Sequence, residues 1–432
     1  MKLRLAVKIG LGLFFLFLVL GCFLPLAARV TEQGAYTEKV ELISDHFDGF
    51  RYFNPEVPET LPSPSSQAAR WIWNRIFRTN WSEWPNQTDF LPGVPPVAHG
   101  QEGSLRVTPV GHGTFLIQLD GVNILTDPMW SERCSPLSWV GPKRVHQPGI
   151  RFDDLPRVDA VLISHNHYDH LDLPTLERLA KTGMPRAIVP LGNRDLVRSS
   201  EIPMVHELDW WQSVRLSSNV TITLVPARHY SSRTPWDRNR SLWGGFIISG
   251  QSGNVFYSGD TGYGPHFREI ALRFAPIRVA LLPIAPFHAR DSEESQGYRQ
   301  AIHMGPTEAV KAHIDLGTPV SIAAHFRVFQ LGLDGFNDAV DVLSASLKDH
   351  HLRSDAFVVP MFGQTIDIPP AADVSLAPAC EVHSIGWRPF GTCPPQYRFA
   401  EGIIPLSQHV ARQTSCFMEA CSTADSEMLP VN

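Results

Sequence analysis

The sequence of 432 residues has little excess charge and few cysteines, and both shortages narrow the classes of protein to consider. It contains 37 Lys and Arg residues against 43 Asp and Glu residues, a net charge of −6, with no dense basic block. Proteins that bind nucleic acids usually carry a basic patch, so no nucleic-acid partner is expected. The six cysteines do not make a disulfide scaffold, and none belongs to a Cys-x-x-Cys pair, so a structural zinc site is not indicated.

One long apolar run is present near the N-terminus, from Ile9 to Ala28. Its length is close to the roughly 20 residues that span a bilayer as a helix. Lys2, Arg4 and Lys8 precede the run, so the rest of the chain is expected outside the cytoplasm, in the periplasm of a bacterium. A cleaved signal peptide is the main alternative, and Cys22 lies in a weak lipoprotein-like motif. The sequence favours an uncleaved membrane anchor.

The chain is organised around a short segment, Ser164–Asp172, that carries three histidines and a carboxylate. The apolar run Val158–Ser164 predicts a buried strand before it, and Leu173–Lys181 predicts a helix after it. Side chains two positions apart on an extended chain point the same way, so two of the histidines can converge. Imidazole and carboxylate groups are the ligands that suit zinc and similar metals. The candidate ligands in this segment are His165, His167, Asp169 and His170.

Three later segments each place a possible metal ligand just after an expected strand. His229 follows the strand Val220–Val225, and Asp260 follows Asn254–Tyr257. His325 follows the strand Val320–Ala323. Each signal is weak alone. Together, at successive strand ends, they indicate a metal site with ligands from several parts of the chain.

The remaining pattern alternates strands with helices, which predicts a layered α/β fold. An Asp-Gly turn at Asp120-Gly121 joins two strands as a hairpin. The helix expected near Pro306 has that proline in its first turn and stops at Gly317. The other expected strands are Leu105–Val110, Thr114–Leu119, Val122–Leu125, Ala187–Pro190, Phe246–Ser249, Val279–Ile284 and Ala356–Val359, and the other expected helices are Pro306–Leu316 and Phe336–Lys348.

The His-x-His-x-Asp-His run in this order of ligands resembles the metallo-β-lactamase superfamily. The motifs at 141–144, 163–172, 233–245 and 258–263 are similar to the N-acyl-phosphatidylethanolamine-hydrolysing phospholipase D group. The resemblance covers about Asp45 to Pro370 and implies an αββα sandwich. It also implies one metal held by His165, His167 and His229, a second held by Asp169, His170 and His325, and Asp260 as a bridge between them. One departure is the Phe326–Phe329 segment after the last histidine, where the group more often has Gly-Thr-Phe.

The resemblance further implies an activity. Two Zn²⁺ ions would hold a hydroxide that attacks the phosphorus of a phospholipid such as N-acyl-phosphatidylethanolamine. Asp260 and Asp169 would act in catalysis as metal-binding carboxylates. His303, just before the helix at Pro306, matches a histidine near the active site of that group and is expected to face the substrate. The alternative is a lactonase or β-lactamase-like hydrolase of a small molecule, which would use the same metals.

Four segments are expected along the chain. They are an anchor or signal segment (1–28), an aromatic N-terminal extension (29–100), the hydrolase domain (101–370) and a tail that contains cysteines (371–432). Lys143 and Arg144 could hold a phosphate, although a surface charge pair is the favoured interpretation. The expected partners of the protein are a phospholipid or other small-molecule substrate and a membrane.

Overall fold

The computed structural model describes residues 45–55, 81–90, 92–234, 236–288 and 301–369. The chain divides into two compact units, Met1–Gly49 and Phe50–Asn432, and all helices and strands named below belong to the second. Across the described ranges, no helix combines the length and apolar character needed to cross a membrane. The expected anchor (1–28), most of the N-terminal extension and the tail (371–432) lie outside the described residues.

Seven strands form a first mixed sheet in the order β14-β1-β2-β3-β4-β5-β6. Strands β1, β2 and β3 pair antiparallel as hairpins, and β3 to β6 run parallel. The Asp-Gly turn joins β2 to β3 as predicted. The bounds are β1 (Leu105–Gly111), β2 (Thr114–Leu119), β3 (Val122–Thr126), β4 (Ala160–Leu162), β5 (Arg186–Pro190), β6 (Val205–Leu208) and β14 (Ile366–Asp367).

Seven further strands form a second mixed sheet in the order β13-β12-β11-β10-β9-β8-β7. Strands β7 to β10 pair antiparallel, and β10 to β13 run parallel. The bounds are β7 (Ser213–Arg215), β8 (Thr221–Val225), β9 (Gly245–Gly250), β10 (Gly253–Tyr257), β11 (Ile277–Pro283), β12 (Ser321–Ala324) and β13 (Phe357–Val358).

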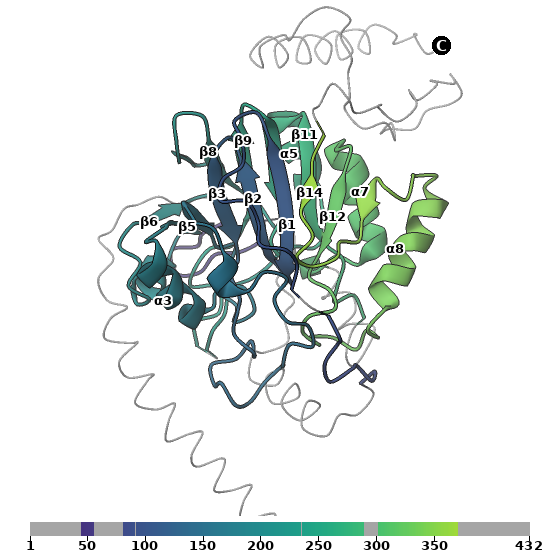
Figure 1. Ribbon diagram of the computed structural model, residues 1–432, viewed down its shortest axis with the longest axis horizontal. Coiled ribbons are helices and arrows are strands. Elements are labelled where there is room, and N and C mark those ends of the chain that lie inside the picture. The colour runs from purple at the N-terminus through teal and green to yellow at the C-terminus, as the bar shows by residue number, and fades with distance from the viewer. Residues whose placement is uncertain (1–44, 56–80, 91, 235, 289–300, 370–432) are drawn as a thin grey trace, which may run out of the picture. The chain divides into compact units, whose positions relative to one another are not determined.

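Helices pack on the two sheets through separate apolar clusters. Leu176 and Leu179 of α3 and Val197 of α4 join the core of the first sheet. Buried residues of α5, α7 and α8 join the core of the second sheet, and Figure 1 shows α8 next to α7. The helix bounds are α3 (Leu173–Thr182), α4 (Arg194–Arg198), α5 (His266–Phe274), α7 (Pro306–Leu316) and α8 (Asp338–Asp349), with a short 3-10 turn at Phe152–Asp154. The predicted α/β fold with two mixed sheets is confirmed.

Strand direction brings the candidate ligands to one edge. In the first sheet β1, β3 and β4 run the same way, and in the second sheet β8, β10 and β12 do. The C-terminal ends of parallel strands meet at one edge of a sheet, so the loops that follow these strands gather there. Figure 1 shows long connecting loops extending from the lower ends of the strands.

Candidate metal centre

Three histidines from two loops meet at one point and form what we call the histidine subsite. His165 and His167 follow β4, and His229 follows β8. The Nδ1 atom of His167 lies 2.8 Å from Nε2 of His165 and 3.2 Å from Nε2 of His229. Nδ1 of His229 lies 2.8 Å from the carbonyl oxygen of Ile302. A carbonyl can only accept, so this nitrogen carries the proton and Nε2 keeps its lone pair. The three converging nitrogens suit one cation.

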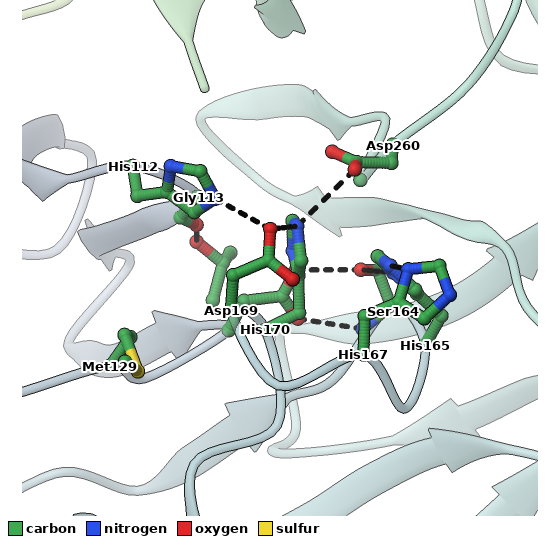
Figure 2. Close-up of polar contacts among 12 residues, drawn as sticks. His112, Gly113, Met129, Ser164, His165, His167, Asp169, His170 and Asp260 are labelled. Atoms are coloured by element: carbon green, nitrogen blue, oxygen red, sulfur yellow. Dashed lines mark hydrogen bonds and ion pairs between the residues drawn. The ribbon is translucent and has the colours of Figure 1, made fainter. Parts of the chain in front are cut away.

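Asp169, His170 and His325 form a second group, which we call the carboxylate subsite. The Oδ2 atom of Asp169 lies 3.3 Å from Nε2 of His170 and 3.3 Å from Nε2 of His325. Nε2 of His112 lies 2.9 Å from the same oxygen, as Figure 2 shows. All of these side chains are buried or nearly so. The group offers one carboxylate and facing imidazole nitrogens to a second cation.

The carboxylate of Asp260 lies between the two subsites. Its Oδ2 atom is 3.1 Å from Nε2 of His325 and 3.4 Å from Nε2 of His170. The same oxygen is 3.9 Å from Nε2 of His229, in the histidine subsite. Figure 2 shows the approach of Asp260 to His170. The structure therefore brings together all seven residues that the sequence analysis singled out as ligands, with Asp260 in a position to contribute to both subsites.

These residues fit a metal centre because several of their polar atoms are buried without a hydrogen bond. Nε2 of His170 and Nε2 of His325 face carboxylate oxygens at 3.1–3.4 Å, yet among the described residues neither nitrogen makes a hydrogen bond of good geometry, and Oδ1 of Asp260 has no hydrogen-bond partner. An unpaired buried polar atom costs about 1–3 kcal/mol, so native structures rarely contain several together. Imidazole nitrogens with carboxylates suit zinc and similar transition metals.

Asp127, directly after β3, supports the ligands from behind and was missed in the sequence. Its fully buried carboxylate accepts hydrogen bonds from the Ser164 N–H at 2.7 Å, the Ser164 hydroxyl at 2.6 Å and Nδ1 of His170 at 2.6 Å. The Tyr257 hydroxyl donates to it as well. The Ser164 hydroxyl oxygen also lies 2.9 Å from Nδ1 of His165. One carboxylate thus orients a ring in each subsite, with Nε2 of His170 directed toward the centre.

The two subsites differ in charge when no metal is bound. Burial lowers the pKa of His229 to about 4. Burial and the neighbouring histidines hold the pKa values of His165 and His167 well below the usual range. Burial also disfavours charge on His170 and His325, but the surrounding carboxylates outweigh it. They raise the pKa of His325 to about 9 and that of His170 well above its usual value. The histidine subsite is therefore neutral near neutral pH, whereas the carboxylate subsite holds protons.

Two further residues lie beside the histidine subsite. Nδ1 of His303 is 3.7 Å from Oδ2 of Asp260, and the His303 ring centroid is 4.9 Å from that of His229. The structure thus places His303 next to the candidate ligands. Asn54 was missed in the sequence: its Nδ2 donates to the His229 carbonyl at 2.8 Å, and its Oδ1 accepts from the His229 N–H at 3.2 Å. Asn54 therefore fixes the backbone of a ligand across a large separation in sequence.

The structure separates the roles of Lys143 and Arg144. Lys143 is exposed and pairs with Glu132 at 2.7 Å. Arg144 is buried, and its guanidinium donates to the backbone carbonyls of Met129 at 2.8 Å and Ser131 at 3.0 Å. The interpretation as a surface charge pair is wrong for Arg144, because its charge lies inside the protein and braces a loop.

A small pocket lies beside the carboxylate subsite. His325 forms part of its wall. Aromatic rings from three segments line it, and Arg327 adds a cation. The rings of Trp84 and Phe336 meet edge to face with centroids 5.3 Å apart. The pocket therefore joins an apolar, aromatic surface to the candidate metal centre.

The part of the chain that carries the candidate ligands is similar in sequence to known proteins. The family described as "Beta-lactamase superfamily domain" matches residues 122–326, a span that includes all seven candidate ligands. N-acyl-phosphatidylethanolamine-hydrolyzing phospholipase D 1 of Caenorhabditis elegans is 33% identical over 61% of this chain and 76% of its own.

Two other relatives are similar over comparable lengths. An uncharacterised protein of Mycobacterium tuberculosis is 39% identical over 63% of this chain and 71% of its own. A metal-dependent hydrolase of Methanopyrus kandleri is 30% identical over 52% of this chain and 85% of its own. With the two mixed sheets and the ligand-bearing edge, these similarities show that the chain belongs to the metallo-β-lactamase superfamily of metal-dependent hydrolases.

Proposed function

We propose that this protein is a phosphodiesterase that hydrolyses phospholipids, with two Zn²⁺ ions in the two subsites. N-acyl-phosphatidylethanolamine is the substrate to test first, because the 33% identical relative from Caenorhabditis elegans is named for hydrolysing it. The observation that carries the proposal is the position of Asp260, whose Oδ2 atom lies 3.1 Å from a histidine of one subsite and 3.9 Å from a histidine of the other. Paired subsites that share a carboxylate are suited to hydrolyse a phosphate ester.

The residues of the centre have separate tasks in this proposal. Two bound metal ions would lower the pKa of a water nucleophile and offset the charge on the phosphate oxygens. Asp260 has a second carboxylate oxygen, Oδ1, without a hydrogen-bond partner among the described residues, and this atom can orient the attacking water. As the new P–O bond forms, the bond to the leaving alkoxide breaks. In this proposal His303, whose Nδ1 atom lies 3.7 Å from Oδ2 of Asp260, would give that alkoxide a proton.

The surroundings of the centre support a lipid substrate. The aromatic pocket has His325 in its wall, so apolar side chains lie beside the metal centre where a lipid substrate would approach. Two loops next to the centre also carry exposed apolar side chains. The 131–143 loop exposes Trp139 by 61% and Val140 by 44%, and the 231–240 loop exposes Trp236 by 62%. Tryptophan is favoured at the interface between membrane and water.

Both loops are attached to the segment that carries the ligands. Ser131 donates to the carboxylate of Asp172 through its N–H at 3.1 Å and its hydroxyl at 2.8 Å. The N–H of Ser232 donates to Oδ1 of Asn166 at 2.9 Å, and Arg233 donates to the Asn166 carbonyl at 2.9 Å. Because the first residues of both loops are hydrogen-bonded to the ligand segment, their exposed tryptophans support a lipid surface as the place of reaction.

A lipid panel tests this function. Purified protein is stripped of metal, reloaded with Zn²⁺ and incubated with vesicles that contain N-acyl-phosphatidylethanolamine, and the products are measured by mass spectrometry. The proposal predicts phosphatidic acid and the free N-acylethanolamine, both dependent on added metal. Turnover of lactones or β-lactams without any turnover of phosphodiesters would contradict it and favour the small-molecule alternative. Asp260→Asn serves as the inactive control.

We also propose that residues 1–28 anchor the protein and that the catalytic domain lies outside the cytoplasm. The support is the apolar run from Ile9 to Ala28 with Lys2, Arg4 and Lys8 before it. Protease added to cells stripped of any outer barrier should digest the body of the protein, and deletion of residues 1–28 should release it from the membrane fraction. Protection from the protease would contradict the proposed orientation.

A further inference from the structure

The β1–β2 hairpin places a histidine, His112, against the carboxylate subsite. The tip of this hairpin is Gly111-His112-Gly113, and His112 adopts φ 56°, in the left-handed region that residues other than glycine seldom adopt. Its side chain is buried, with 2% exposed. Backbone strain of this kind persists where the surrounding structure enforces it, and it concentrates at functional sites.

The hairpin tip is held firmly against the ligands. The Thr114 hydroxyl donates to the Asp127 carbonyl at 2.7 Å, and the Thr126 hydroxyl donates to the Gly113 carbonyl at 2.7 Å. A Cβ on Gly113 would lie only 3.2 Å from Nδ1 of His170. The backbone of the tip therefore lies close to His170, and hydrogen bonds with the end of β3 hold it there.

His112 contacts all three members of the carboxylate subsite, and its ring centroid lies 5.3 Å from that of His170. Its Nε2 atom lies 2.9 Å from Oδ2 of Asp169, which can only accept while ionised, so Nε2 carries the donated proton. Its carbonyl oxygen accepts the backbone N–H of His325 at 3.0 Å. The rings of His112 and His325 lie with their centroids 3.9 Å apart. Figure 2 shows the His112 ring directed at Asp169.

We propose that His112 is a positioning residue of the second metal site: it holds the Asp169 carboxylate with its ring and the His325 backbone with its carbonyl. This inference rests on the metal centre of the proposed function. The carbonyl contact does not depend on the side chain, and a phenyl ring can keep the ring contacts, so His112→Phe removes only the donor to Asp169. Removal of such an outer partner typically costs about 10–100-fold in metal affinity.

Metal-binding measurements on three variants test the role of His112. His112→Phe keeps the ring volume and removes the donor, whereas His112→Gln keeps an N–H donor at similar reach. His313→Phe is a matched control, because His313 is equally a buried histidine, 5% exposed, but hydrogen-bonds Ser321 in the core. Titration with Zn²⁺ against a chromophoric chelator gives the two affinities, Co²⁺ spectra report ligand loss, and melting of the metal-free proteins checks the fold.

The expected result is specific to one subsite. His112→Phe should bind the first metal normally and the second about 10–100-fold more weakly, and His112→Gln should recover most of that loss with an unchanged Co²⁺ spectrum. Normal binding of both metals by a folded His112→Phe would overturn the proposal. Equal losses in both variants with altered Co²⁺ bands would also overturn it, because His112 would then be a ligand itself. Failure of the wild-type protein to bind two metals would instead refute the metal centre.

Discussion

Metal binding to the two subsites should respond differently to pH. A metal ion and a proton compete for the same imidazole lone pair, so a protonated histidine must lose its proton before it binds a metal. His229 has a pKa of about 4 and is already neutral above that pH, and His165 and His167 have pKa values well below the usual range. His325, with a pKa of about 9, and His170, with a raised pKa, hold protons near neutral pH.

The size of the effect follows from these values. With the pKa of His325 at about 9, roughly two pH units separate it from neutrality, which costs about a hundredfold in apparent affinity, or roughly 3 kcal/mol. The affinity of the carboxylate subsite should therefore rise by at least about tenfold per pH unit up to that pKa, and more steeply because His170 releases a proton too. The histidine subsite should show no slope in the same range.

Stability of the metal-free protein should change in the opposite direction. A histidine whose pKa is raised by folding stabilises the fold fully below its unfolded pKa, and this contribution is lost as the pH rises through the folded pKa. The melting temperature of the metal-free protein should thus fall as the pH rises from about 6.5, the ordinary pKa of histidine, to about 9, the pKa of His325 in the fold. The metal-loaded protein should show less of this loss, because its second metal has already displaced the protons.

Chelator competition with buffered Zn²⁺ at about pH 6.5, 7.5 and 8.5 resolves the two affinities across the relevant range. Calorimetry in buffers of different ionisation enthalpy counts the protons released by each metal. Near neutral pH, the expected number of protons released per bound metal is close to zero for the histidine subsite and at least one for the carboxylate subsite. Equal slopes for the two metals, or no proton release with the second, would refute the assignment of charge.

Three further predictions concern named side chains. Asp127→Asn should weaken the binding of metal about 10–100-fold, because the amide cannot accept from every donor around the carboxylate, while Tyr257→Phe, which removes one donor, should bind metal nearly normally in the same chelator assay. His303→Ala should keep both metals and lower kcat by about 10²–10⁴-fold, with a smaller loss for a nitrophenolate leaving group; equal losses on both substrates would indicate phosphate positioning instead. The double variant Trp139→Ser, Trp236→Ser should turn over vesicle lipid more slowly than the wild type but turn over a soluble phosphodiester at the same rate. If the variant and the wild type turn over vesicle lipid at equal rates, these two side chains do not contact the membrane.

The fold could be predicted largely from local signals, most accurately where strong end signals exist. The helix predicted at Leu173–Lys181 ends one residue later in the structure, and the one predicted at Pro306–Leu316 has those bounds. Each has a proline in its first turn and a glycine after its end. The sequence did not indicate β6, β7 or α5. The first two are short edge strands with few buried residues, so their pattern is weak.

The strand before the ligand segment shows how the site overrides the local pattern. The sequence predicts a strand over Val158–Ser164, but only Ala160–Leu162 forms β4. The Ser164 N–H turns away from the sheet and donates to the carboxylate of Asp127 at 2.7 Å. The apolar pattern continues to Ile163, one residue beyond the end of β4, so it does not mark where the strand stops. Contacts with a distant carboxylate decide where the strand stops.

Local sequence patterns also identify only part of the site. The candidate ligands could be identified because several histidines and a carboxylate in one short segment are unusual. Asp127, His112 and Asn54 occur as single residues at a strand end, a hairpin tip and a remote loop. Only the tertiary structure brings them to the ligands, although the shared direction of β1, β3 and β4 predicts that residues after all three strands lie at one edge. Strand direction is therefore the signal that finds Asp127 and His112.

The charge pattern explains how this centre can persist in a folded chain without metal. Three buried carboxylates, Asp127, Asp169 and Asp260, would destabilise the core if nothing balanced their charge. The raised pKa values of His170 and His325 mean that protons supply this balance when the metal is absent. A metal ion would then replace protons rather than organise an unfolded site. In small zinc domains metal binding drives folding, whereas here two layers of sheet and the Asp127 hydrogen bonds position the candidate ligands.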